Sequence, residues 1–184
     1  EGLVARMLRN QQTMFNYHSN LNATHPYSSN WYQWPFIWKP MFYYSKQISD
    51  TVGAGISAFG NPLVWYAGIP AAIYMIYLMI AKKDRNAMFL FLGYLAQYLP
   101  WMLVTRCVFI YHYFPSVPFV VMMVGYSIYK IVGDNKQRRK WAYIYVAAAV
   151  LLFAMFYPVL SGHNVSYDFV NTWLKWFDKW VLVL

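Results

Sequence analysis

The stretch NPLVWYAGIPAAIYMIYLMIA, residues 61–81, decides the fold class of this chain. It is almost entirely apolar and carries no charged side chain, and a helix of about 20 such residues crosses the hydrocarbon core of a bilayer. Three further apolar runs follow at residues 87–105, 116–132 and 141–160. The sequence therefore predicts an all-α integral membrane fold with four transmembrane helices.

The composition agrees with a membrane protein. The chain has 184 residues, of which 60% are hydrophobic and only 11% are charged, whereas a soluble domain carries about 25% charged residues. The formal net charge of +9 does not indicate a nucleic-acid partner, because the basic residues gather in short loops between the apolar runs. We therefore expect no nucleic acid among the partners of this chain.

Basic residues in two short connections predict the orientation in the membrane. The connection after the first span carries Lys82, Lys83 and Arg85, and the connection after the third span carries four basic residues within residues 136–140. Because Lys and Arg are enriched in cytoplasmic loops, we expect both connections on the cytoplasmic side and both termini on the extracytoplasmic side. The inverted topology is the alternative.

Residues 1–60 are predicted to form an extracytoplasmic segment of three parts. The first 24 residues favour an amphipathic helix, which either lies in the membrane interface or packs on the rest of the protein; its apolar positions are Leu3, Met7, Met14, Phe15 and Leu21. A loop rich in Trp and Tyr follows. Residues 41–60 contain the Tyr, Ile, Val and Gly that favour extended chain or a hairpin.

The tail, residues 161–184, is predicted to lie at the extracytoplasmic interface, with an amphipathic interfacial helix over residues 172–184. Its aromatic residues recur at helical spacing, and aromatic rings of this kind gather at membrane–water interfaces; they are Trp173, Trp176, Phe177 and Trp180.

Candidates for a catalytic base are scarce on the expected outer side. Asp50 and Asp168 lie there, but neither belongs to a paired-carboxylate motif, and such residues commonly act in turns or helix caps. The four histidines lack the spacing with Glu of a helical zinc site. We therefore predict no catalytic residue and no metal site in this chain.

Two segments rich in aromatic and polar residues are the candidate binding segments. They are HPYSSNWYQWPF, residues 25–36, and TRCVFIYHYFPSVP, residues 105–118. Arg106 lies at the end of the second predicted span, where it either reaches lipid head groups or binds an anion such as phosphate. His25 and His112 lie among aromatic residues, which favours a hydrogen-bonding role.

Three motifs together resemble a known family. HPYSSNWYQWP, then GNPLVWY at the start of a span, then RCVFIYHYFPSVPF resemble the C-terminal four-helix module of the protein O-mannosyltransferases, membrane glycosyltransferases of the GT-C class. Tyr66 stands where many members have a second Trp, and Lys39 where an Arg is often seen. The resemblance, which covers the whole chain, implies that this is the C-terminal part of a longer, bacterial-type enzyme.

The resemblance also implies a reaction, the transfer of mannose from a polyprenyl- or dolichyl-phosphate carrier to Ser or Thr hydroxyls of exported proteins. In this family the catalytic Asp lies in the N-terminal half, so this module is expected to supply binding residues, and the outer ends of its spans are expected to hold the prenyl chain. No cofactor is implied besides the lipid-linked sugar donor. The implied substrate-binding residues are His25, Tyr27, Ser28, Trp31, Trp34, His112 and Tyr113, and the implied lipid-phosphate contacts are Arg106 and Lys39.

The implied protein is a multi-pass membrane protein of the plasma membrane in a bacterium or of the endoplasmic reticulum in a eukaryote. Its expected partners are the N-terminal catalytic half of the same enzyme, membrane lipids, exported acceptor proteins and, in a dimer, a second subunit. Two other classes remain open from the residues alone. One is a noncatalytic membrane scaffold or partner-binding module. The other is a small transporter or channel, which predicts polar residues buried in the spans, here Gln97 and Lys130.

Overall fold

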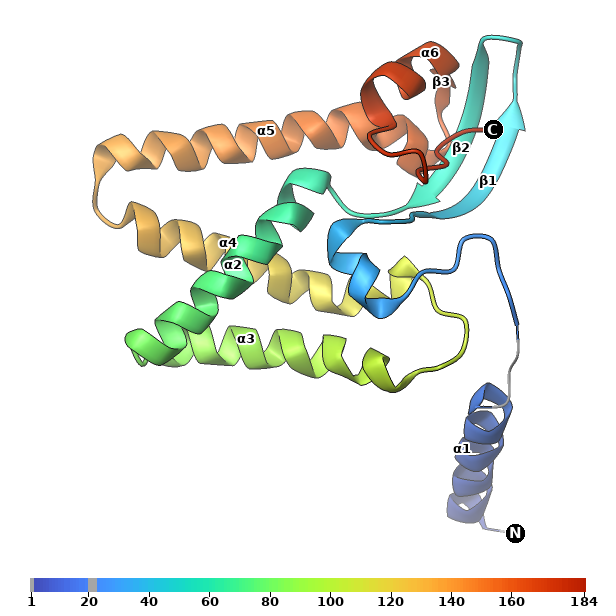
Figure 1. The fold of residues 1–184 in the computed structure, drawn as a ribbon, viewed down its shortest axis with the longest axis horizontal. Helices are drawn as coiled ribbons and strands as arrows, with labels where there is room; N and C mark the ends of the chain where they lie inside the picture. Colours follow the sequence, from blue (N-terminus) through green and yellow to red (C-terminus); the bar gives the residue numbers. More distant parts are fainter. Residues whose placement is uncertain (1, 20–22) are drawn as a thin grey trace.

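The structure is a computed structural model that describes residues 2–19 and 23–184. Long helices make up most of it, and a small three-stranded sheet lies at one end of them (Figure 1). The prediction of a mostly helical chain is therefore confirmed, whereas the strict all-α class is corrected by the sheet. Four of these long helices follow one another in the chain, namely α2 (Pro62–Ala81), α3 (Arg85–Tyr98), α4 (Val117–Val132) and α5 (Lys136–Ser161).

Short polar residues before three of these helices fix where each begins. The side-chain oxygens of Asn61, Asp84 and Asn135 each accept hydrogen bonds from two backbone N–H groups in the first turn of α2, α3 and α5. Such caps satisfy N–H groups that have no partner within the helix. The Asn61 amide also donates to the Ala149 carbonyl at 2.7 Å, which ties the start of α2 to α5.

Within the described residues, three segments are long and apolar enough to cross a membrane. They are Pro62–Ala81, Ile110–Val132 and Lys136–Ser161. The second predicted span, residues 87–105, differs: α3 ends at Tyr98 and the chain continues as a 3-10 helix, η2 (Leu99–Leu103). Pro100 stands at the start of η2 and has no N–H to donate to the preceding turn, which ends the α-helix.

The helices place the two basic connections at the same end of the molecule. Residues 82–84 and 133–135 lie at one end, which we call the basic end, and the sheet and the C-terminus lie toward the other (Figure 1). At the basic end, the Lys130 ammonium lies 2.7 Å from the Asp84 carboxylate. The polar residues considered for a transport path are thus not buried within the spans: Lys130 is ion-paired near a helix end, and Gln97 is exposed.

The predicted hairpin is present and forms most of the sheet. Its strands are β1 (Met41–Gln47) and β2 (Val52–Ala58), and β3 (Asn164–Ser166) adds to β2, with antiparallel pairing throughout. The last residues of the chain contact this sheet. The hydroxyl of Ser57, on β2, donates a hydrogen bond to the Val181 carbonyl at 2.8 Å. Gly55 permits this close approach, since a Cβ there would overlap the Leu182 carbonyl.

The tail corrects the prediction of an amphipathic interfacial helix over residues 172–184. After a turn of helix, α6 (Tyr167–Phe169), and the wider turn η4 (Val170–Leu174), residues 175–184 are not helical. Trp180 is fully buried, and its indole N–H donates to the Ile37 carbonyl at 2.7 Å. The aromatic residues therefore occupy different environments, because burial of Trp180 in the core outweighs the local helical pattern.

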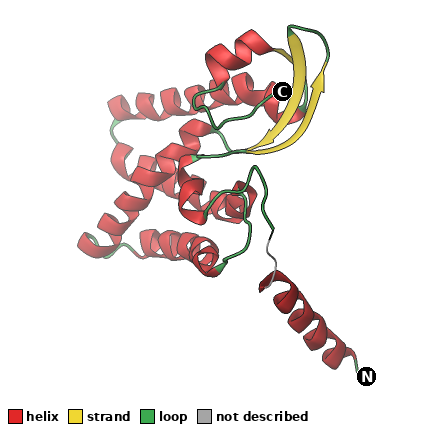
Figure 2. Ribbon diagram, turned by 45° about the vertical axis from the view of Figure 1, so that its right-hand side comes forward, coloured by secondary structure: helices red, strands yellow, loops and turns green. Residues whose placement is uncertain are grey.

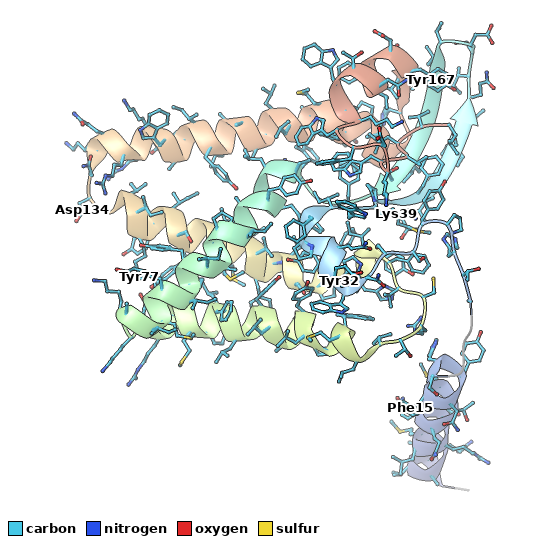
Figure 3. The ribbon with its side chains drawn as sticks, viewed as in Figure 1. Phe15, Tyr32, Lys39, Tyr77, Asp134 and Tyr167 are labelled. Atoms are coloured by element: carbon cyan, nitrogen blue, oxygen red, sulfur yellow. The ribbon has the colours of Figure 1, made fainter. Side chains whose placement is uncertain are left out.

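Helix α1 (Leu3–Ser19) stands apart from the other helices (Figure 2). None of its residues is buried, so α1 does not contribute to the core of this chain, and its placement in the membrane interface or against the rest of the protein stays a prediction. Leu21, predicted as its last apolar position, lies outside the described residues. Figure 3 labels Phe15 on α1, which is 72% exposed.

Candidate functional site

A cavity of about 660 Å³ opens between the aromatic loop, the segment after η2 and the tail. Four of the residues proposed from the sequence line it, namely His25, Ser28, Lys39 and Arg106. They come from two segments that are far apart in the chain, so the fold brings together part of the predicted binding set.

Three cationic side chains line this cavity. Lys39 follows the aromatic loop, Arg106 follows η2, and Lys179 comes from the tail. The described residues that line the cavity include no carboxylate. Cationic side chains grouped in this way suit a phosphate or another anion. Lys179 was not among the predicted binding residues, because the tail was expected to form a separate helix at the interface.

Hydrogen bonds hold the loop that forms one wall of the cavity. The backbone N–H of Tyr27 donates to His25 Nδ1 at 3.2 Å, and the Ser28 hydroxyl donates to the His25 carbonyl at 2.9 Å. The Ser29 N–H donates to the Val108 carbonyl at 2.9 Å. This last bond joins the two walls on which His25 and Arg106 lie.

The 3-10 helix η1 (Trp31–Phe36) decides which aromatic rings face the core. A 3-10 helix has three residues per turn, so Trp31, Trp34 and the following Ile37 share one face, which is directed inward. Trp34 and Ile37 are fully buried, while Tyr32 and Phe36 on the other faces are each 53% exposed.

Trp34 holds the loop in place and does not line the cavity. Its indole N–H lies 3.0 Å from the Ser29 carbonyl and 3.1 Å from the Ser29 hydroxyl. Its carbonyl accepts a hydrogen bond from the Trp65 indole at 2.8 Å. The ring also stacks on His112, with the centroids 6.1 Å apart. The Trp34 side chain is fully buried, so none of its surface is open to a ligand.

The other proposed aromatic residues also pack against protein. Tyr113 is only 3% exposed, and its hydroxyl lies 3.0 Å from the Tyr94 hydroxyl.

The Trp31 ring packs on Tyr98. The Tyr27 ring lies 5.8 Å from the Phe42 ring, measured between the ring centroids. His112 is half-buried and hydrogen-bonded through Nδ1 to Phe109. None of these four lines the cationic cavity.

An unusual backbone conformation directs the chain from η1 into the cavity wall. Ile37 has a φ of 46°, a left-handed value that is costly for a β-branched residue. Its fully buried side chain and the Trp180 indole bound to its carbonyl hold it there. The chain then continues to Trp38 and Lys39, which both line the cavity.

The described residues offer no obvious metal site. Within residues 2–19 and 23–184 no three His, Cys, Asp or Glu side chains lie close enough together to hold an ion. The cationic and polar side chains that line the cavity suit anion binding and hydrogen bonding.

Comparison with known sequences identifies the family. A profile of the C-terminal four TMM region of protein-O-mannosyltransferase matches residues 3–180. The chain belongs to this family. The resemblance drawn from the three sequence motifs is thereby confirmed.

Several members of the family match most of this chain. It is 28% identical to polyprenol-phosphate-mannose–protein mannosyltransferase of Mycobacterium tuberculosis, over 90% of this chain and 35% of that protein. It is 24% identical to the enzyme of the same name from Corynebacterium glutamicum, over 96% of this chain and 37% of that protein. This chain thus spans little more than a third of those relatives.

A solved structure shares the fold. It is the Saccharomyces cerevisiae protein O-mannosyltransferase Pmt1–Pmt2 complex bound to the sugar donor, which this chain matches with a TM-score of 0.80 and 21% identity. The match covers 98% of this chain and 27% of the yeast chain. Helices and sheet therefore follow the arrangement of that module.

Proposed function

We propose that this chain is the C-terminal part of a polyprenyl-phosphate-mannose-dependent protein mannosyltransferase. The observation that carries the proposal is the convergence of Lys39, Arg106 and Lys179 on one cavity in a member of this family. The curated relatives are named for a polyprenol-phosphate-mannose donor. In our proposal the cavity binds the phosphate of such a donor.

The proposed chemistry is displacement at the anomeric carbon of mannose. A Ser or Thr hydroxyl oxygen of the acceptor protein forms the new bond to this carbon, and the bond to the phosphate oxygen breaks. Negative charge then increases on the leaving lipid phosphate, where the guanidinium of Arg106 and the two ammonium groups stabilise it. The hydroxyl proton goes to a carboxylate of the N-terminal half, because no carboxylate lies among the described residues of this cavity.

The remaining predicted residues take two roles in this proposal. His25 and Ser28 line the cavity and offer polar groups to the mannose hydroxyls. Trp34 and Tyr113 lie in the core and hold the cavity walls in position.

We further propose that the sheet and the cavity lie on the extracytoplasmic side. The support is the grouping of basic residues at the opposite end. Lys39 lies toward the sheet, whereas Asp134 lies at the basic end (Figure 3). Exported acceptor proteins would then meet the cavity directly, and a prenyl-phosphate donor would reach it from the adjacent outer leaflet.

The test is the substitution Arg106→Gln in the full-length protein, with mannosyl transfer measured in membranes. We expect kcat/KM for the lipid-linked donor to fall at least tenfold, because a charge-assisted hydrogen bond to phosphate is lost. Lys46→Gln is the matched control, because Lys46 is exposed on β1 and does not line the cavity. Unchanged transfer by correctly inserted Arg106→Gln protein would mean that the cavity does not bind the donor phosphate. It would favour the alternative in which this C-terminal part is a noncatalytic scaffold for the rest of the enzyme.

A further inference from the structure

An apolar groove lies between α2, α4 and α5, in the half of the molecule that faces the basic end. Asn61 ties the start of α2 to α5, and from there the two helices diverge toward the basic end (Figure 1). The groove has a volume of about 280 Å³, and no charged side chain lies among its described lining residues. Along α4 it extends from Val124 to Val132, about 12 Å at the rise of an α-helix.

One polar atom of this groove has no partner in the protein. The Tyr145 side chain lines the groove from α5, and its hydroxyl is buried without a hydrogen bond to any described residue. Because an unpaired buried hydroxyl is costly, this atom favours a ligand that brings an acceptor. A transmembrane helix offers few acceptors, since its backbone carbonyls are bonded within the helix. An ester carbonyl of a lipid meets the requirement.

Cationic side chains stand where the groove reaches the basic end. The Arg138 guanidinium donates to the Ile131 carbonyl at 3.1 Å, and Ile131 lines the groove. A guanidinium has five N–H donors, and this bond uses one of them. The Lys140 ammonium lies 5.5 Å from the centroid of the Trp141 ring, which also lines the groove. Among the residues that the structure describes, neither cation forms an ion pair with a carboxylate.

We propose that this groove binds an anionic phospholipid from the membrane leaflet at the basic end. The lipid phosphate contacts Arg138 and Lys140, an ester carbonyl accepts a hydrogen bond from Tyr145, and one acyl chain lies along the apolar groove. Tyr145 follows Trp141 by one turn of α5, about 6 Å deeper. The protein thus presents cations, a buried donor and an apolar wall in the order in which a phospholipid presents its phosphate, ester and chain.

This site is separate from the cationic cavity of the proposed function. The cavity lies toward the sheet, whereas the groove lies at the opposite end of the helices, which our proposed orientation places in the cytoplasmic leaflet. A polyprenyl phosphate fits the groove less well than a phospholipid, because it has no ester carbonyl to pair with the Tyr145 hydroxyl. A bound phospholipid would fill the space between the diverging α2 and α5 and stabilise the folded protein.

The experiment compares the purified full-length enzyme in nanodiscs of phosphatidylcholine and of equal parts phosphatidylcholine and phosphatidylglycerol. We expect phosphatidylglycerol to raise the thermal midpoint of the wild type and to stay bound in native mass spectrometry. Arg138→Gln should weaken phosphatidylglycerol binding about tenfold, because a charge-assisted hydrogen bond is lost. Lys82→Gln is the matched control, since Lys82 is an exposed cation of the same end, in the connection between α2 and α3.

Two further variants test the groove itself. Tyr145→Phe keeps the ring and should weaken phosphatidylglycerol binding about threefold. In detergent without phospholipid the same variant should be at least as stable as the wild type, because it removes a hydroxyl that has no partner. Ala142→Phe places a ring in the groove from the same helix, so it should weaken retention of phosphatidylglycerol more than Tyr145→Phe does.

Three results would overturn the proposal. Equal effects of Arg138→Gln and Lys82→Gln would mean that anionic lipid acts only through the general positive charge of this end. Unchanged phosphatidylglycerol binding in folded Tyr145→Phe and Ala142→Phe would mean that another part of the enzyme fills the groove. Stronger retention of undecaprenyl phosphate than of phosphatidylglycerol would mean that the groove holds a prenyl lipid.

Discussion

The lysines at the two ends of the helices have different surroundings. At the basic end, Lys130 lies 2.7 Å from the Asp84 carboxylate, and the Tyr126 hydroxyl donates to the same carboxylate at 2.9 Å. At the sheet end, Lys39 and Lys179 line a cavity with no carboxylate among its described lining residues.

This difference separates a structural lysine from one that is available to a ligand. The Asp84 carboxylate also accepts hydrogen bonds from two backbone N–H groups at the start of α3, so the Lys130 pair joins the start of α3 to α4. At the sheet end, Lys39 and Lys179 have no carboxylate beside them among the described residues that line the cavity. A phosphate ligand would supply there the negative charge that Asp84 supplies at the basic end.

The largest effect is expected from Trp34→Ala, which removes the support of the cavity wall. A fully buried Trp replaced by Ala costs about 3–5 kcal/mol of stability, and the Ser29 carbonyl loses its indole donor. We expect a large drop in the thermal midpoint of the purified full-length protein, together with loss of donor binding. Trp34→Phe keeps most of the ring and should lose about 1–2 kcal/mol. A wild-type thermal midpoint in Trp34→Ala would show that this ring does not hold the wall.

A smaller effect is expected from Lys179→Gln, which removes one of three cations from the cavity. Because Lys179 is exposed and its charge is partly screened by water, we expect KM for the lipid-linked donor to rise about fivefold, with little change in thermal stability. Lys175→Gln in the same tail is the control, because Lys175 does not line the cavity. Equal effects of the two substitutions would contradict a specific role for Lys179.

The sequence was sufficient for the family, the main helices and the hairpin, because each depends on local signals. Capping residues fix the starts of α2 and α5, and the extended residues of the hairpin form β1 and β2. The tail could not be predicted from local periodicity. Its Trp180 is bound to Ile37, 143 residues away in the chain, and no spacing within the tail indicates that contact.

The aromatic loop shows the same limit on a smaller scale. The sequence indicated a binding segment but not which rings would be available. The period of three residues in η1 turns Trp34 inward and leaves Tyr32 and Phe36 exposed. Trp34 was expected to bind substrate because the family resemblance implied it, whereas Tyr32 and Phe36 were not among the implied residues. Backbone conformation therefore decided which aromatic rings remained free for a ligand.

The comparison between the two ends can be sharpened with a double-mutant cycle on Asp84 and Lys130. Asp84→Asn keeps a capping residue and Lys130→Met keeps an apolar stem, so each removes chiefly the ion pair. We expect each single substitution to lower the thermal midpoint modestly, and the double variant to cost less than the sum. Mannosyl transfer should remain close to wild type in all three. Strict additivity would mean that the two side chains do not stabilise each other.

The pH dependence of the same pair gives the smallest expected effect. The hydrogen bond from Lys130, followed by that from the Ala87 N–H, lowers the pKa of Asp84 to about 2, below the ordinary value of about 3.9. A carboxyl group with a lowered pKa binds fewer protons in the folded state, so its contribution to stability is present above about pH 4 and disappears as the pH falls toward 2. The difference in thermal midpoint between wild type and Asp84→Asn should therefore be constant from pH 7 to 5 and shrink below pH 4. A difference that stays constant down to pH 2 would contradict the lowered pKa and show that the pair is not the source of the stability.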